Sequence, residues 1–185
     1  SPIIAVFVHE SPDTNYGELY WGTNSRRKYA QILVEELIPF IDGNYRTIAS
    51  AESRANIGMG WAGEVTLYST LNYPGIFSKV SCQSTLFWDY ERDEPELKQL
   101  LSTTEKQPLA IYFEWGKYDI KSISMKLNSA ERNKAIAKLF TDKGYVLAGG
   151  EVNDGHGWAS WRNRTDKILE MFFPLEPSSI SSETK

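Results

Sequence analysis

Strand-like and helix-like segments alternate along almost the whole of this 185-residue chain. Continuous β-branched and apolar runs predict strands at residues 3–8, 54–59, 77–82, 109–115 and 145–152. Apolar residues at helical spacing predict helices at residues 25–41, 61–71, 94–101, 129–143 and 158–172. This regular alternation predicts an α/β fold, with a mostly parallel sheet and helices on both of its faces.

Composition narrows the class of protein further. The net charge of −4 and the scattered basic residues argue against a nucleic-acid partner, and no apolar run is long enough for a membrane span. The single cysteine, Cys82, excludes an internal disulfide and a multi-cysteine zinc site. Two distant histidines give no metal site, so we expect neither metal nor cofactor. One domain is predicted over residues 1–174, with a disordered polar tail over 175–185.

A glycine-rich turn joins the strand at 54–59 to the following helix. Its sequence, Gly58-Met59-Gly60-Trp61-Ala62-Gly63, is similar to a G-x-S-x-G elbow, a sharp turn that raises a serine hydroxyl above an α/β sheet. Gly60 stands where the serine would be, and Ala62 replaces the second outer glycine. The run also fits G-x-G-x-x-G, but a dinucleotide site would need an acidic residue at the end of the next strand. Residues 81–84 contain none, which disfavours that reading.

Two further polar residues follow later strands in a suggestive order. Asp119 comes shortly after the strand at 109–115, and His156 lies between two glycines after the strand at 145–152. The carboxyl ends of parallel strands meet at one edge of a sheet, so Gly60, Asp119 and His156 are expected to converge. Nucleophile, acid, histidine is the chain order of α/β-hydrolases. The other histidine, His9, is expected to be a structural or rim residue.

Several runs together resemble one known family. The chain is similar to the esterases of the α/β-hydrolase class that include enterochelin (ferric-siderophore) and feruloyl-type esterases. The matching runs are 36–42, 44–47, 53–55, 73–77, 82–84, 87–88, 155–156 and 158–162, and the likeness extends to about Pro174. The resemblance implies an α/β-hydrolase-type sheet that lacks the family's N-terminal strands.

The same resemblance assigns roles to individual positions. It implies that His156 is the general base, that Asp119 orients its imidazole, and that Gly60 occupies the position of the nucleophile. The backbone N–H of Trp61 would be one oxyanion donor. The resemblance places five side chains near a cleft that would take an ester or an aromatic, catechol-like ligand: Gln83, Ser84, Trp88, Trp158 and Trp161.

The departures from the family leave three functions open. Glycine has no side chain, so a covalent acyl intermediate at Gly60 is impossible and a non-hydrolytic ligand- or partner-binding domain is predicted. The alternative is an active ester hydrolase in which His156 activates water directly. A third reading is an interaction module with a vestigial cleft. The family's strand order also implies a missing strand between residues 3–8 and 54–59, so we expect a partner chain or a further segment to complete the sheet.

Overall fold

Four parallel strands form the central sheet of the molecule. The computed structural model describes residues 2–8 and 23–175, and in that part of the chain the sheet has the order β1-β2-β3-β6. The strands are β1 (Ala55–Met59), β2 (Lys79–Gln83), β3 (Ala110–Tyr118) and β6 (Leu147–Gly155), and each adjacent pair is parallel. The predicted α/β class with a parallel sheet is therefore confirmed, as are four of the five predicted strands.

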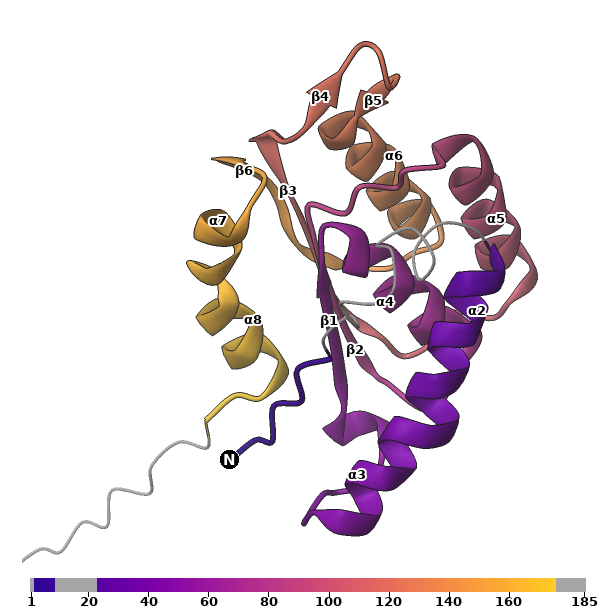
Figure 1. The fold of residues 1–185 in the computed structure, drawn as a ribbon, viewed down its shortest axis with the longest axis vertical. Coiled ribbons are helices and arrows are strands. Elements are labelled where there is room, and N and C mark those ends of the chain that lie inside the picture. Colours follow the sequence, from indigo (N-terminus) through magenta and orange to yellow (C-terminus); the bar gives the residue numbers. More distant parts are fainter. Residues whose placement is uncertain (1, 9–22, 176–185) are drawn as a thin grey trace, which may run out of the picture.

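Helices cover both faces of this sheet (Figure 1). One face carries α4 (Trp61–Asn72), α5 (Tyr90–Thr103) and α6 (Ser129–Asp142), and α2 (Thr23–Gln31) packs on the outside of α4. A π-helical stretch, Ile32–Leu37, continues α2 into α3 (Ile38–Asn44). The opposite face carries α7 (Trp158–Arg162) and α8 (Thr165–Phe172). A 3-10 turn (Ala51–Ser53) precedes β1, and a short antiparallel ribbon of β4 (Lys121–Ser122) and β5 (Leu127–Asn128) follows β3.

Alternate side chains of the strands supply a core on each face. The larger core lies under α4, α5 and α6, and its fully buried members include Val80, Phe113 and Phe140. A smaller core under α8 gathers Tyr112, Ile168 and Phe172. The central strands β2 and β3 are buried at most of their positions, and strands covered on both faces by helices need apolar residues throughout, which is why continuous apolar runs predicted these two.

The boundaries of several helices differ from the predicted ones. The helical stretch that starts at α2 runs to Asn44 at the end of α3, three residues beyond the predicted end at residue 41. The predicted helix at 94–101 extends further at both ends as α5, so that Pro95 lies inside it. The predicted helix at 158–172 is broken between α7 and α8, where Arg164 has φ −126° and ψ 2°. At this break the Arg164 side chain forms ion pairs with Glu114 and Asp154.

The prediction of a buried strand at residues 3–8 is wrong. These residues are extended but belong to no sheet, and Phe7 is 92% exposed. A strand needs a neighbour to accept and donate its backbone hydrogen bonds, and among the described residues β1 pairs with β2 alone. Apolar composition made the segment look like a core strand, but within residues 2–8 and 23–175 no strand pairs with it. His9 and the predicted tail from residue 176 onward lie outside the described residues.

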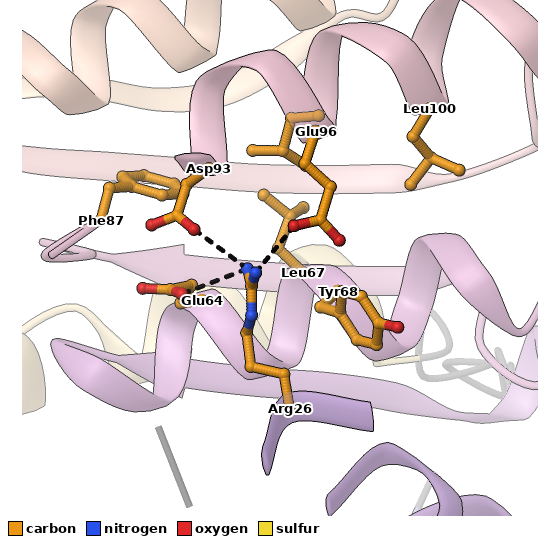
Figure 2. A pocket seen from close by; sticks show the side chains of 9 residues that line it. Arg26, Glu64, Leu67, Tyr68, Phe87, Asp93, Glu96 and Leu100 are labelled. Carbon is orange, nitrogen blue, oxygen red and sulfur yellow. Dashed lines mark hydrogen bonds and ion pairs between the residues drawn. The ribbon is translucent and has the colours of Figure 1, made fainter. Parts of the chain in front are cut away.

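A buried charge cluster fastens α2 to the rest of the fold (Figure 2). The Arg26 guanidinium of α2, only 3% exposed, pairs with Glu64 of α4 at 3.2 Å and with Asp93 of α5 at 3.3 Å. On the outer side of the cluster, the Glu96 carboxylate pairs with the Arg26 guanidinium at 2.8 Å. Burial raises the pKa of Glu64 to about 7, with Asp93 adding to the effect and Arg26 and Arg92 opposing it.

Candidate active site

The turn after β1 holds Gly60 in a backbone conformation that residues with a side chain rarely adopt. Its φ is 56° and its ψ is −121° at the N-cap of α4. The turn is fixed on both sides, because the Gly60 N–H donates to the Gln83 carbonyl at 2.9 Å and the Gly60 carbonyl accepts from Leu86 N–H at 3.3 Å. Close contact between β1 and α4 also requires Gly58, where a Cβ would lie 2.3 Å from Thr66 Oγ1. This is the geometry of a strand-to-helix elbow.

The imidazole of His156 faces the apex of this turn. A Cβ built on Gly60 would lie 3.5 Å from His156 Nε2 and 3.3 Å from Trp161 Cη2. A hydroxyl on such a Cβ would therefore come within hydrogen-bonding reach of the imidazole. Burial lowers the pKa of His156, so its neutral, proton-accepting form is favoured at neutral pH. Residues 60 and 156, separated by most of the chain, thus meet at one point.

Asp119 lies behind the same imidazole. Its Oδ1 is 3.8 Å from His156 Nδ1, and its Oδ2 accepts from the Gly116 N–H at 3.0 Å. The Oδ1 to Nδ1 distance is longer than a hydrogen bond, although acid–histidine contacts of ligand-free sites often tighten only when a ligand is bound. Burial raises the pKa of Asp119, and hydrogen bonds from Gly116 and Ser84 oppose that rise. Residues 60, 119 and 156, which follow β1, β3 and β6, therefore lie together at the carboxyl ends of these strands.

The absence of a side chain at Gly116 lets β3 lie close to the end of β6. A Cβ at this position would lie 2.5 Å from the Asp154 carbonyl oxygen and 2.8 Å from Asp119 Oδ1. Both distances are far below van der Waals contact, so any larger residue would push the loop that carries His156 away from the carboxylate.

Two pairs of tryptophan rings include a neighbour of Gly60. Trp61, the residue after Gly60 and the first of α4, and Trp88 have ring centroids 4.9 Å apart. The Trp161 ring packs edge-on against His156 at 4.8 Å and against Trp158 at 5.5 Å. Trp161 is 6% exposed, whereas Trp158 is 72% exposed. The N–H groups at the start of α4, that of Trp61 first, point out of the helix toward this end of the sheet.

The two polar residues predicted to contact a ligand are buried. Gln83 is fully buried, and its Nε2 lies 3.4 Å from Glu114 Oε1 and 3.5 Å from the Trp161 carbonyl. Ser84 is 1% exposed with a φ of 48°, and its side chain hydrogen-bonds to Asp119. Both side chains therefore hold neighbouring parts of the site in place, and their contact with a ligand stays a prediction.

Sequence reasoning missed a second polar group beneath the site. Glu114 of β3 is fully buried and accepts hydrogen bonds from Arg164 Nε at 2.6 Å and from the Tyr112 hydroxyl at 2.5 Å. Arg164 also donates to Asp154 at 3.0 Å. A glutamate inside an otherwise apolar strand was the available signal, because a buried carboxylate requires a cationic or hydrogen-bonding partner.

Other kinds of site are not found in the described part of the chain. No three histidine, cysteine or acidic side chains within residues 2–8 and 23–175 are placed to hold a metal ion. None of the helices described there has the length and apolar character needed to cross a bilayer.

Comparison with known proteins supports the fold and the family. Residues 2–172 match the model of the family described as "Putative esterase". An endo-1,4-beta-xylanase/feruloyl esterase of Xylanibacter ruminicola is 25% identical over 93% of this chain, which spans 21% of that protein. The Bacillus subtilis protein YjcH is 25% identical over 72% of the chain, which spans 55% of that relative.

Solved structures show the same architecture. A ferulic acid esterase superposes with a TM-score of 0.64 at 17% identity, over 78% of this chain and 60% of its own length. The Shigella flexneri enterobactin esterase superposes with a TM-score of 0.63 at 21% identity, over 85% of this chain and 40% of its own length. Because the family model covers nearly every residue up to the end of α8, this chain belongs to the esterase family of α/β-hydrolases.

Proposed function

We propose that this esterase-family domain binds an ester or an aromatic carboxyl compound without forming a covalent acyl intermediate. The observation that carries the proposal is the position of Gly60, where an added Cβ would lie 3.5 Å from His156 Nε2. His156 and Asp119, the proposed base and acid, lie beside a position that has no hydroxyl. Without the nucleophile, any remaining catalysis would be orders of magnitude below that of an intact triad.

The class of ligand follows from the groups around Gly60. Trp161 lies 3.3 Å from a Cβ built on Gly60 and packs against Trp158. Trp61 follows Gly60 directly and packs against Trp88. Flat aromatic rings stack favourably on such surfaces. The N-terminus of α4, beginning at Trp61, favours a partial negative charge on an ester carbonyl or a carboxylate. An aryl ester or a catechol-type acid satisfies both features.

The test compares aryl ester hydrolysis by the unmodified chain with that of Gly60→Ser and Gly60→Ala. The two variants place the same Cβ in the same backbone conformation, and only serine adds a hydroxyl. Gly60→Ser is expected to exceed both of the other proteins at least about a hundredfold. His156→Ala in the Gly60→Ser background should remove this gain. Vigorous hydrolysis by the unmodified chain that depends on His156 would overturn the proposal.

A second candidate function is hydrolysis by water that His156 activates directly. It is favoured by the neutral imidazole, whose pKa burial lowers, facing a position that no side chain occupies. General-base attack by water forgoes the advantage of a covalent intermediate. If this function holds, the unmodified chain hydrolyses the ester with a rate that falls as His156 becomes protonated at acidic pH, and His156→Ala abolishes this pH dependence.

We further propose that a strand from another segment or a partner chain pairs with the outer edge of β1. Within residues 2–8 and 23–175 only β2 pairs with β1, and an unpaired strand edge invites pairing. The chain spans well under two thirds of the relatives compared above. Backbone amides of β1 should therefore exchange faster with solvent in this chain than in a longer polypeptide that contains it. Equal exchange would contradict this proposal.

A further inference from the structure

The residues around His156 form a closed loop. The segment 154–164 leaves the end of β6, passes through His156 and α7, and returns at Arg164. Arg164 Nη1 donates to Asp154 Oδ2 at 3.0 Å, so the first and last residues of the segment are joined by a charge-assisted hydrogen bond. Between them the segment carries His156, Trp158 and Trp161. The positions of His156, Trp158 and Trp161 therefore depend on how this one loop is held.

Arg164 also anchors the closed loop to the sheet. Its Nε donates to Glu114 Oε1 at 2.6 Å, and Glu114 lies on β3, five residues before Asp119. The loop carrying His156 and the strand carrying Asp119 thus share one guanidinium. The planar fork of arginine suits this arrangement, because two of its N–H groups address two carboxylates in fixed directions.

Burial makes this connection costly to break. Glu114 is fully buried and the Arg164 side chain is 14% exposed. Removing one partner of a buried ion pair leaves the other charge without compensation. Asp154 and Glu114 would also repel each other if the guanidinium between them were lost. The two ion pairs therefore favour one position of the loop over alternatives in which Arg164 is solvated.

We propose that Arg164 is a positioning residue, which holds His156 and Trp161 against Gly60 by clamping the loop 154–164 to Glu114. The proposal rests on the proposed function in assigning a role to His156, but the clamp itself can be tested without catalysis. The role proposed for Arg164 involves no contact with Gly60 or with a ligand. Arg164 acts on the site only through the position of the loop 154–164.

The first experiment measures amide hydrogen exchange in the full chain. The Ser160 and Trp161 N–H groups donate to the Gly157 carbonyl at 3.0 and 3.1 Å, so their exchange reports the opening of the loop. Arg164→Lys keeps the charge but cannot reproduce the two directed bonds. Asp154→Asn weakens the loop-closing pair together with the bonds that the Asp154 carboxylate accepts from the Ser160 side chain and the Gly155 N–H, all of which lie within the loop. Both substitutions should speed exchange of these two amides about tenfold or more relative to amides of β2. Arg162→Lys, on the exposed face of α7, is the matched control and should change nothing.

The second experiment follows the His156 imidazole by NMR. His9→Gln leaves it as the only histidine of the chain. Loosening the loop admits water, so Arg164→Lys should raise the pKa of His156 toward the ordinary imidazole value. In the Gly60→Ser background the same substitution should lower kcat/KM about tenfold or more, since misplacing a base by about 1 Å is costly.

The outcomes separate the two proposals. If Gly60→Ser is inactive but loop exchange and the His156 titration respond to Arg164→Lys, the clamp stands and the proposed function fails. If Arg164→Lys and Asp154→Asn both behave like Arg162→Lys in exchange and titration, the clamp is overturned. Should Arg164→Lys fail to fold, exchange in Asp154→Asn decides the matter.

Discussion

At the scale of single residues, the site is defined by one missing side chain and the groups that surround its position. Gly60, Asp119 and His156 could be predicted from the sequence, because each follows a strand and parallel strands end at the same edge. The 3.8 Å approach of Asp119 to His156 and the burial of Ser84 could not. Those features depend on side-chain packing between residues distant in the chain, for which one sequence has no local signal.

A prediction at this scale concerns the stability of the elbow. Any side chain at residue 60 must adopt the φ of 56°, which costs on the order of 1–3 kcal/mol, and must displace the Trp161 ring slightly. Gly60→Ser and Gly60→Ala are each expected to lower the free energy of unfolding by about 1–2 kcal/mol in urea titrations. Equal losses in the two variants would assign the cost to the backbone conformation and the Cβ, which they share, and not to the serine hydroxyl. A stabilised Gly60→Ala would contradict the strained conformation.

At the scale of secondary structure, local patterns predicted elements well wherever a neighbour was present to complete them. Strands β2 and β3 were recognised because burial on both faces requires apolar runs, whereas β1 and β6, at the two edges of the sheet, are only partly buried. Residues 3–8 have the same apolar composition, yet in the described part of the chain they pair with no strand, because composition alone does not place a segment beside another strand's backbone groups. The break between α7 and α8 was missed, and Arg164 at this break pairs with Glu114, fifty residues away in sequence, a contact that no local pattern indicates.

Close contact between β3 and the end of β6 leads to a second prediction. Gly116→Ala would bring a Cβ within 2.5 Å of the Asp154 carbonyl, and overpacking of this kind costs about 1–3 kcal/mol. We expect a loss of stability in that range, together with a larger separation of Asp119 from His156. Gly43→Ala is the control, because a Cβ on Gly43 in α3 meets nothing within 4 Å. Thermal unfolding of the two variants, compared with the parent, provides the measurement.

At the scale of the whole molecule, the charge cluster of Arg26, Glu64 and Asp93 joins α2, α4 and α5 into one layer (Figure 2). A buried cluster of this kind gives little net stability by itself, since desolvation offsets much of the attraction. Burial raises the pKa values of both Glu64 and Asp93. The folded protein therefore retains protons here that the unfolded chain has already released, and its stability must depend on pH.

The third prediction gives the direction of that dependence. Glu64 titrates near 4.5 when unfolded and at about 7 when folded. Its contribution to stability is therefore fully present below about pH 4.5 and is lost as the pH rises through 7. Glu64→Gln stays neutral throughout, so it should gain stability relative to the parent between pH 5 and 8, on the order of 2 kcal/mol. Urea unfolding of both proteins at several pH values measures this difference.

Glu96→Gln provides the control for this measurement, because Glu96 pairs with the same guanidinium but its side chain is 33% exposed. Its stability difference from the parent should vary much less with pH, since water already solvates that carboxylate. If the difference for Glu64→Gln were also constant from pH 5 to 8, Glu64 would be ionised throughout that range. The Arg26 and Arg92 guanidiniums would then outweigh burial, and the cluster would hold α2 in place equally well at acidic and neutral pH.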